Sequence, residues 1–180
     1  MRKSIPLVST IAMTALFALA APATAATPAA PATPATATGH GAVVSFRLAP
    51  PNTAVSPDGG TMAAPGDWIK VGGGGSFEPA TGSVRAGGTF THYSADGTVH
   101  CAGTWRATQV TGWTDFGRGG GSAALRVTHY CSTMGEVHTD IPMTVTSTRN
   151  APPGSSYVAG TTVGEFTVPT GGKVTITISR

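Results

Sequence analysis

The fold is decided by one stretch, GGTFTHYSADGTVHCAGTW, which runs from Gly87 to Trp105. Two runs of alternating residues flank Asp96-Gly97, a dipeptide preferred in two-residue type I′ turns, so the stretch predicts a β-hairpin. A two-residue loop pairs His92 with Cys101, and a four-residue loop keeps the same faces. A three-residue loop with a glycine bulge instead sets His92 opposite His100.

The hydrophobic pattern chooses between these registers, because register specifies which face of a sheet is buried. With an even-length loop, apolar and polar residues separate cleanly. One face then carries Val84, Ala86, Phe90, His92, Val99, Cys101 and Trp105. The other face carries Arg85, Thr89, Thr91, Tyr93, Thr98, His100, Thr104 and Arg106. We therefore predict that His92 and Cys101 point inward.

The chain after residue 39 is rich in Gly, Thr and Val, with frequent turn residues and no capped helical periodicity, which predicts an all-β fold. Strands are expected at residues 42–48, 67–71, 83–93, 98–109, 123–131, 137–148, 161–168 and 173–179. Eight strands suit a small antiparallel barrel or a two-sheet β-sandwich. Glycines beside strand residues permit the sharp bends of barrel corners and favour the barrel.

The same alternation assigns faces to the later strands. In the strand at 123–131, the residues expected to point inward are Leu125, Val127, His129 and Cys131. In the strand at 137–148, those expected to point inward are Val137, Thr139, Ile141, Met143 and Val145, with His138 and Asp140 outside. The interior is therefore predicted to hold two histidines, His92 and His129.

The N-terminus predicts export. Residues 1–25 combine a basic start, an apolar run and a small-x-small pattern at Ala23-Thr24-Ala25, which indicates a secretory signal peptide. Residues 26–38 contain only Ala, Thr and Pro and are expected to form an extended, disordered linker. Residues 39–180 have the size of a single domain. We expect a secreted, extracellular protein without a membrane span.

The cysteine count fits that compartment. Cys101 and Cys131 are the two cysteines of the chain, and an oxidising environment favours their pairing. A bridge that closes a loop of this size stabilises the fold by about 3 to 4 kcal/mol. The alternative is two buried free thiols.

Charge and residue types exclude several functions. Of the 11 Lys and Arg residues, Arg2 and Lys3 lie in the predicted signal, and the rest are scattered singly against 8 acidic residues. Nucleic-acid binding therefore lacks its electrostatic footprint. With both cysteines oxidised, the interior offers two histidines, too few for a metal site. We expect no metal and no cofactor.

Two binding hypotheses remain. In the first, the barrel binds a small, mostly apolar ligand in its interior, and the residues expected to bind it are His92, His129, Phe90 and Trp105. The alternative for both histidines is a position in a packed core, with the ring hydrogen-bonded to a backbone carbonyl or a threonine hydroxyl. In the second hypothesis, the connection at 107–122 binds or inhibits an extracellular protein through Trp113, Phe116 and Arg118. The alternative there is a loop that folds back, so that Trp113 plugs one barrel end.

The stretch from Gly75 to Gln109 resembles a group of uncharacterised secreted bacterial proteins built on a G-x-F, G-G-T-F-T-H, D-G-T-V and G-T-W core. The resemblance implies an extracellular β domain, brings no activity with it and draws attention to His92. A more distant likeness to lipocalin-like and allene-oxide-cyclase-like barrels rests on the Gly-aromatic hairpins. A cyclase-like or isomerase-like barrel enzyme is the third hypothesis, although the chain has no G-x-S-x-G nucleophile elbow.

Overall fold

The computed structural model describes residues 41–179, so the predicted signal peptide and linker lie outside the described residues. Within that range the chain forms strands and turns and contains no helix, which confirms the all-β prediction. The nine strands are β1 (Val43–Val55), β2 (Trp68–Glu78), β3 (Ser83–Tyr93), β4 (Val99–Gly117), β5 (Gly120–Cys131), β6 (Glu136–Ser147), β7 (Gly160–Val163), β8 (Val168–Gly171) and β9 (Val174–Ser179).

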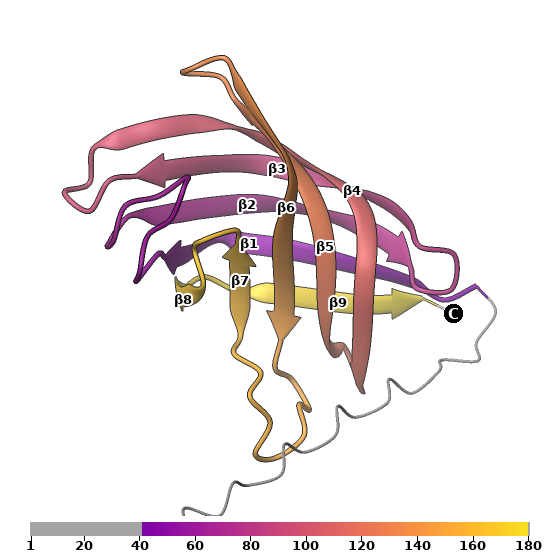
Figure 1. The fold of residues 1–180 in the computed structure, drawn as a ribbon. Coiled ribbons are helices and arrows are strands. Elements are labelled where there is room, and N and C mark those ends of the chain that lie inside the picture. Colours follow the sequence, from indigo (N-terminus) through magenta and orange to yellow (C-terminus); the bar gives the residue numbers. More distant parts are fainter. Residues whose placement is uncertain (1–40, 180) are drawn as a thin grey trace, which may run out of the picture. The chain divides into compact units, whose positions relative to one another are not determined.

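The strands form a nearly closed antiparallel barrel (Figure 1). Neighbours follow the order β7-β6-β5-β4-β3-β2-β1, and β1 then pairs with two strands in succession. Its first half pairs with β9 and its end pairs with β8, so these two short strands together fill the eighth position. Among the described residues no ladder joins β7 to β8 or β9, and this seam stays unsealed. The barrel prediction is confirmed.

Alternating residues of the long strands fill the barrel, as the hydrophobic pattern predicts. The largest fully buried side chains include Trp105, Phe77, Ile69, Leu125 and Met143. The Trp105 indole N–H donates to the carbonyl of Gly72 over 2.9 Å, which satisfies its polar atom inside the core. Gly88 lies where two strands approach closely, and a Cβ there would collide with that same carbonyl. Glycine is required at this bend because only a backbone without a side chain fits.

The central hairpin, made of β3 and β4, has the predicted register. His92 pairs with Cys101, and both side chains are buried. Cys101 also forms a disulfide with Cys131 of β5, with a Cα–Cα distance of 5.8 Å. The inward direction of both cysteines and the disulfide are confirmed.

The turn of this hairpin is not one of the even-length loops. The Ser94 N–H donates to the carbonyl of Thr98 over 2.8 Å, so residues 95–97 form a three-residue loop. A β-bulge at His100 adds one residue to β4 and restores the predicted register further along. Val99 lies between the turn and the bulge and is 49% exposed, so its predicted inward direction was wrong.

Several strand boundaries also differ from the predictions, and β1 and β2 run on to Val55 and Glu78. The connection expected at 107–122 is strand for most of its length, because β4 runs to Gly117 and β5 begins at Gly120. Three register shifts along this pair interrupt the alternation, which hides the strand from a pattern with period two. The single strand expected at 161–168 is instead β7 and β8, separated by a tight turn at Gly164 with φ 55°.

Candidate functional site

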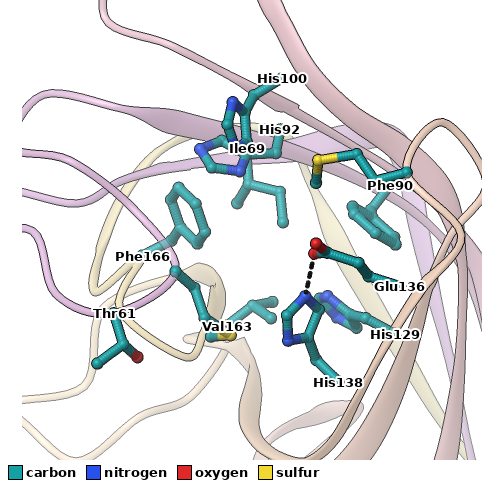
Figure 2. A pocket seen from close by; sticks show the side chains of 12 residues that line it. Thr61, Ile69, Phe90, His92, His100, His129, Glu136, His138, Val163 and Phe166 are labelled. Carbon is teal, nitrogen blue, oxygen red and sulfur yellow. Dashed lines mark hydrogen bonds and ion pairs between the residues drawn. The ribbon is translucent and has the colours of Figure 1, made fainter.

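One end of the barrel contains a cavity of about 130 Å³ (Figure 2). Four of the chain's five histidines line it, one from each of the neighbouring strands β3 to β6. The lining consists of Thr61, Met62, Ile69, Phe90, His92, His100, His129, Met134, Glu136, His138, Val163 and Phe166. The lining therefore combines apolar side chains with imidazoles, and Figure 2 shows His92 and His100 on the opposite side of the cavity from His129 and His138.

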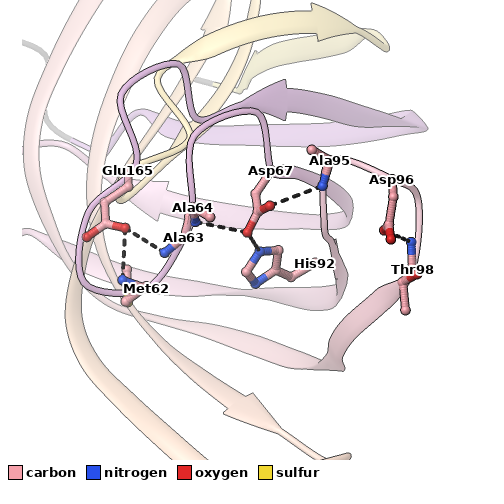
Figure 3. A network of polar contacts seen from close by, with 9 residues as sticks. All are labelled: Met62, Ala63, Ala64, Asp67, His92, Ala95, Asp96, Thr98 and Glu165. Atoms are coloured by element: carbon pink, nitrogen blue, oxygen red, sulfur yellow. Dashed lines mark hydrogen bonds and ion pairs between the residues drawn. The ribbon is translucent and has the colours of Figure 1, made fainter.

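His92 is held by a buried carboxylate (Figure 3). Its Nε2 lies 3.0 Å from Oδ2 of Asp67, the residue directly before β2. The ring also packs edge-on against Phe166, with centroids 5.0 Å apart. Both partners of the hydrogen bond are buried, so the pair is shielded from bulk water. His92 was predicted to be a ligand-binding residue, and its side chain lines the cavity. Its contact with Asp67 was not predicted.

Asp67 is ionised in this setting. Burial raises the pKa of Asp67, but hydrogen bonds from the Ala64 N–H, from His92 and from the Ala95 N–H outweigh it, and the pKa lies below its usual value. The two backbone donors lie 3.0 and 3.1 Å from the carboxylate oxygens. Because an ionised carboxylate only accepts hydrogen bonds, the Nε2–H of His92 must be the donor. Whenever the ring is in its neutral form, the lone pair is on Nδ1.

His100 reaches the cavity because of the bulge in β4. The sequence pattern placed it on the outer face, and its side chain is exposed. A bulge re-aims side chains relative to regular alternation. As a result the His100 ring lies 4.9 Å from that of His92, centroid to centroid, at the mouth of the cavity.

His129 lies deeper. It is only 6% exposed, and its ring stacks on Phe90 with centroids 4.4 Å apart and an interplanar angle of 23°. Between β3 and β5, the position on β4 that pairs with Phe90 is Gly103, which has no side chain to separate the two rings. Burial, together with repulsion from His138, lowers the pKa of His129 to about 4. The imidazole is therefore neutral at physiological pH.

The Nε2 atom of His129 is buried and has no hydrogen-bond partner among the described residues. An unsatisfied buried polar atom costs about 1 to 3 kcal/mol. The prediction of a core histidine bonded to a carbonyl or hydroxyl does not account for this nitrogen. Its side chain lines the cavity, so a bound molecule could satisfy it.

His138 also differs from its predicted direction. A register shift in the β5–β6 pair adds one residue to β6, at Asp140, whose φ is 59°. The extra residue inverts the alternation beyond it, so that His138 pairs with His129 and lines the cavity. Val137 is 56% exposed and Thr139 is exposed, so their predicted inward directions were wrong.

A second carboxylate fixes the loop that covers the cavity. Thr61 and Met62, in the connection between β1 and β2, belong to the lining. Glu165, in the turn between β7 and β8, accepts hydrogen bonds from the backbone N–H groups of Thr61, Met62 and Ala63 and from the Thr61 hydroxyl. Figure 3 shows this clamp beside the Asp67 network. Burial raises the pKa of Glu165, but these donors outweigh it and lower the pKa.

The predicted ligand-binding residues divide into two groups. Phe90, His92 and His129 come together in the cavity. Trp105 is buried in the packed core, bonded to a backbone carbonyl, and does not line the cavity. Its size and amphipathic character fit either place, so the sequence could not separate them.

The three residues predicted to bind proteins do not form one exposed surface. Trp113 is half-buried and packs edge-on against Phe77, with centroids 5.4 Å apart. Phe116 contacts Tyr157 with centroids 4.7 Å apart, and Arg118 is exposed at the hairpin turn. Their role in protein binding stays a prediction.

Among residues 41–179, no cluster of three or more His, Cys, Asp or Glu side chains has an arrangement that could hold a metal ion. In the same range, no helix is long and apolar enough to cross a membrane. Comparison of the chain with protein-family models, with curated proteins and with solved structures found no match.

Proposed function

We propose that this barrel binds a small, ring-sized ligand with an apolar body and one polar group, in the cavity lined by His92 and His129. The observation that carries the proposal is the buried Nε2 atom of His129, which has no hydrogen-bond partner among the described residues and belongs to a side chain that lines the cavity. Secretion, and a relation to the secreted bacterial proteins with the same hairpin motif, belong to the same proposal. The disulfide is compatible with an oxidising compartment.

The size of the cavity supports a compact ligand. An engineered apolar cavity of about 150 Å³ binds benzene. The present cavity, of about 130 Å³, fits one ring or the ring-shaped end of a longer molecule. Much of the barrel interior is occupied by a cluster of buried hydrophobic side chains, which favours a compact ligand over a large one.

The chemistry of the wall supports one polar group on that ligand. Phe90, Ile69 and Phe166 offer apolar contacts, and neutral His129 offers either a donor or an acceptor at Nε2. A hydroxyl group can satisfy either tautomer of the imidazole. A matched pair of probes, phenol and benzene, therefore separates the polar contribution from the apolar one.

The test is ligand-observed NMR titration of the full chain with phenol and with benzene. We expect phenol to bind about tenfold more tightly, the worth of one hydrogen bond of about 1.4 kcal/mol. His129→Phe keeps the stacking on Phe90 but removes the nitrogen, so the preference for phenol should disappear. Lys70→Gln, on the exposed face of β2, is the matched control and should behave like the wild type. The proposal would be overturned if neither probe bound, or if His129→Phe kept the preference for phenol.

A further inference from the structure

We infer that His92 is a general base, positioned by Asp67, that moves a proton on a ring-sized carbonyl compound bound in the cavity, an inference that rests on the proposed function. The hydrogen bond of 3.0 Å between Nε2 and the Asp67 carboxylate fixes the ring tautomer. Nδ1 is left as the proton acceptor, because Asp67 takes Nε2 as its hydrogen-bond partner. The carboxylate stabilises the imidazolium that forms when Nδ1 takes a proton, as in Asp-His pairs of hydrolases.

The two buried histidines differ in the way that such a reaction requires. His92 has a buried anion behind it, whereas His129 stacks on Phe90 and forms no ion pair with any of the residues that the structure describes. A neutral imidazole can donate its N–H to a carbonyl oxygen on which negative charge develops. His129, in its Nε2–H tautomer, is therefore suited to hold the oxygen while His92 takes the proton.

The reaction class is a 1,3-proton shift in a β,γ-unsaturated ketone. The C–H bond between the carbonyl and the double bond breaks, and its proton moves to Nδ1 of His92. The electron pair delocalises into a dienolate whose oxygen accepts the hydrogen bond of His129. The proton then returns from Nδ1 to the γ carbon, the double bond moves into conjugation and His92 is neutral again. Atoms and electrons balance without a further reactant.

The probe is 3-cyclohexen-1-one, whose isomerisation to 2-cyclohexen-1-one is followed by the absorbance of the conjugated product. We expect the full chain to accelerate the reaction with saturation kinetics. His92→Gln should lower kcat by roughly 10²- to 10⁴-fold, the range for one general base. Asp67→Asn should lower kcat more than it raises KM and should change the pH profile, because Asp67 is a positioning residue. Lys70→Gln should leave the rate unchanged.

Several titratable groups near His92 can contribute to the pH profile of the reaction. These groups are Asp67 behind the ring, His100 at the mouth, and His129, Glu136 and His138 on the opposite wall. The pH profiles of the wild type and of His92→Gln should therefore be compared directly, and they should differ.

If His92→Gln fails to fold, carbethoxylation of wild-type histidines with diethyl pyrocarbonate, mapped by mass spectrometry, gives the answer. Loss of activity should track modification at His92 and be prevented by 2-cyclohexen-1-one.

Binding of 2-cyclohexen-1-one is measured separately, so that failure of the general-base inference can be distinguished from failure of the proposed function. Binding without isomerisation above the buffer rate, or isomerisation that survives loss of His92, would overturn the general base and leave the proposed function intact. Phenol binding without binding of 2-cyclohexen-1-one would also overturn this inference. If none of the probes binds, the proposed function falls together with it.

Discussion

Phe90 and His129 stack across β4 with centroids 4.4 Å apart, and the same imidazole keeps its Nε2 buried without a partner. The stacking fixes the ring, while the unpaired nitrogen costs free energy of folding. The free protein therefore loses stability at a nitrogen to which a bound ligand can hydrogen-bond.

We predict that His129→Phe stabilises the ligand-free protein by about 1 kcal/mol, because phenylalanine keeps the stacking and removes the unsatisfied nitrogen. Urea unfolding of the two proteins measures the difference, with Lys70→Gln as the control. A variant less stable than the wild type would show that the His129 nitrogen has a partner in the free protein.

Glu165 should make stability depend on pH. Its pKa is lower in the folded protein than its ordinary value of 4.5, so the ionised group stabilises the fold above that value. This contribution is lost as the pH falls through the lower folded value. Glu165→Gln should cost on the order of 1 kcal/mol at neutral pH, a figure discounted for solvent exposure, and the cost should vanish in acid.

The measurement is urea unfolding of wild type and Glu165→Gln across that pH range. Asp58→Asn is the matched control, because Asp58 is exposed in the same connection between β1 and β2. Asp67 titrates in the same direction in both proteins, so the difference between them isolates Glu165. A difference that stays constant with pH would contradict the clamp.

The bulge at Asp140 can be tested with substitutions that differ in their preference for a left-handed backbone. Its φ of 59° lies in the left-handed region, which costs about 1 to 2 kcal/mol for most residues and which glycine adopts freely. Asp140→Gly should therefore keep the stability and the cavity, whereas Asp140→Val should destabilise the protein by about that amount. Equal stability of the two variants would mean that β6 is not bulged at this position.

Removal of the disulfide should loosen the cavity end of the barrel. The double variant Cys101→Ala and Cys131→Ala opens a loop with a sequence separation of 30 residues. We expect a loss of about 2 to 4 kcal/mol in the free energy of unfolding. A urea midpoint close to that of the oxidised wild type would contradict this expectation.

The inward directions of His92 and His129 could be predicted because they follow from alternation within single strands. The barrel was predicted from the number of strands and the glycines beside them, and the disulfide from the two cysteines of a chain expected to be exported. The sequence could not predict the bulges at His100 and Asp140, since a bulge depends on the curvature of the whole sheet. Only the tolerance of Asp for left-handed backbone hinted at the second. Two histidines were therefore assigned to the wrong face.

The carboxylates of the site were missed for a different reason. Asp67 precedes its strand and meets His92 across 25 residues, and Glu165 meets the connection between β1 and β2 across about a hundred. Local patterns describe faces of strands and do not report which turns meet at a barrel end. The Gly-rich end of β4 was missed because three register shifts interrupt its alternation.

The most direct test of ligand binding is native mass spectrometry of the protein purified from a bacterial culture, compared with its mass after denaturation. The account predicts a native mass above the denatured mass by that of one small molecule, which His129→Phe should no longer retain. Equal native and denatured masses in the wild type, together with no binding of phenol, would contradict it.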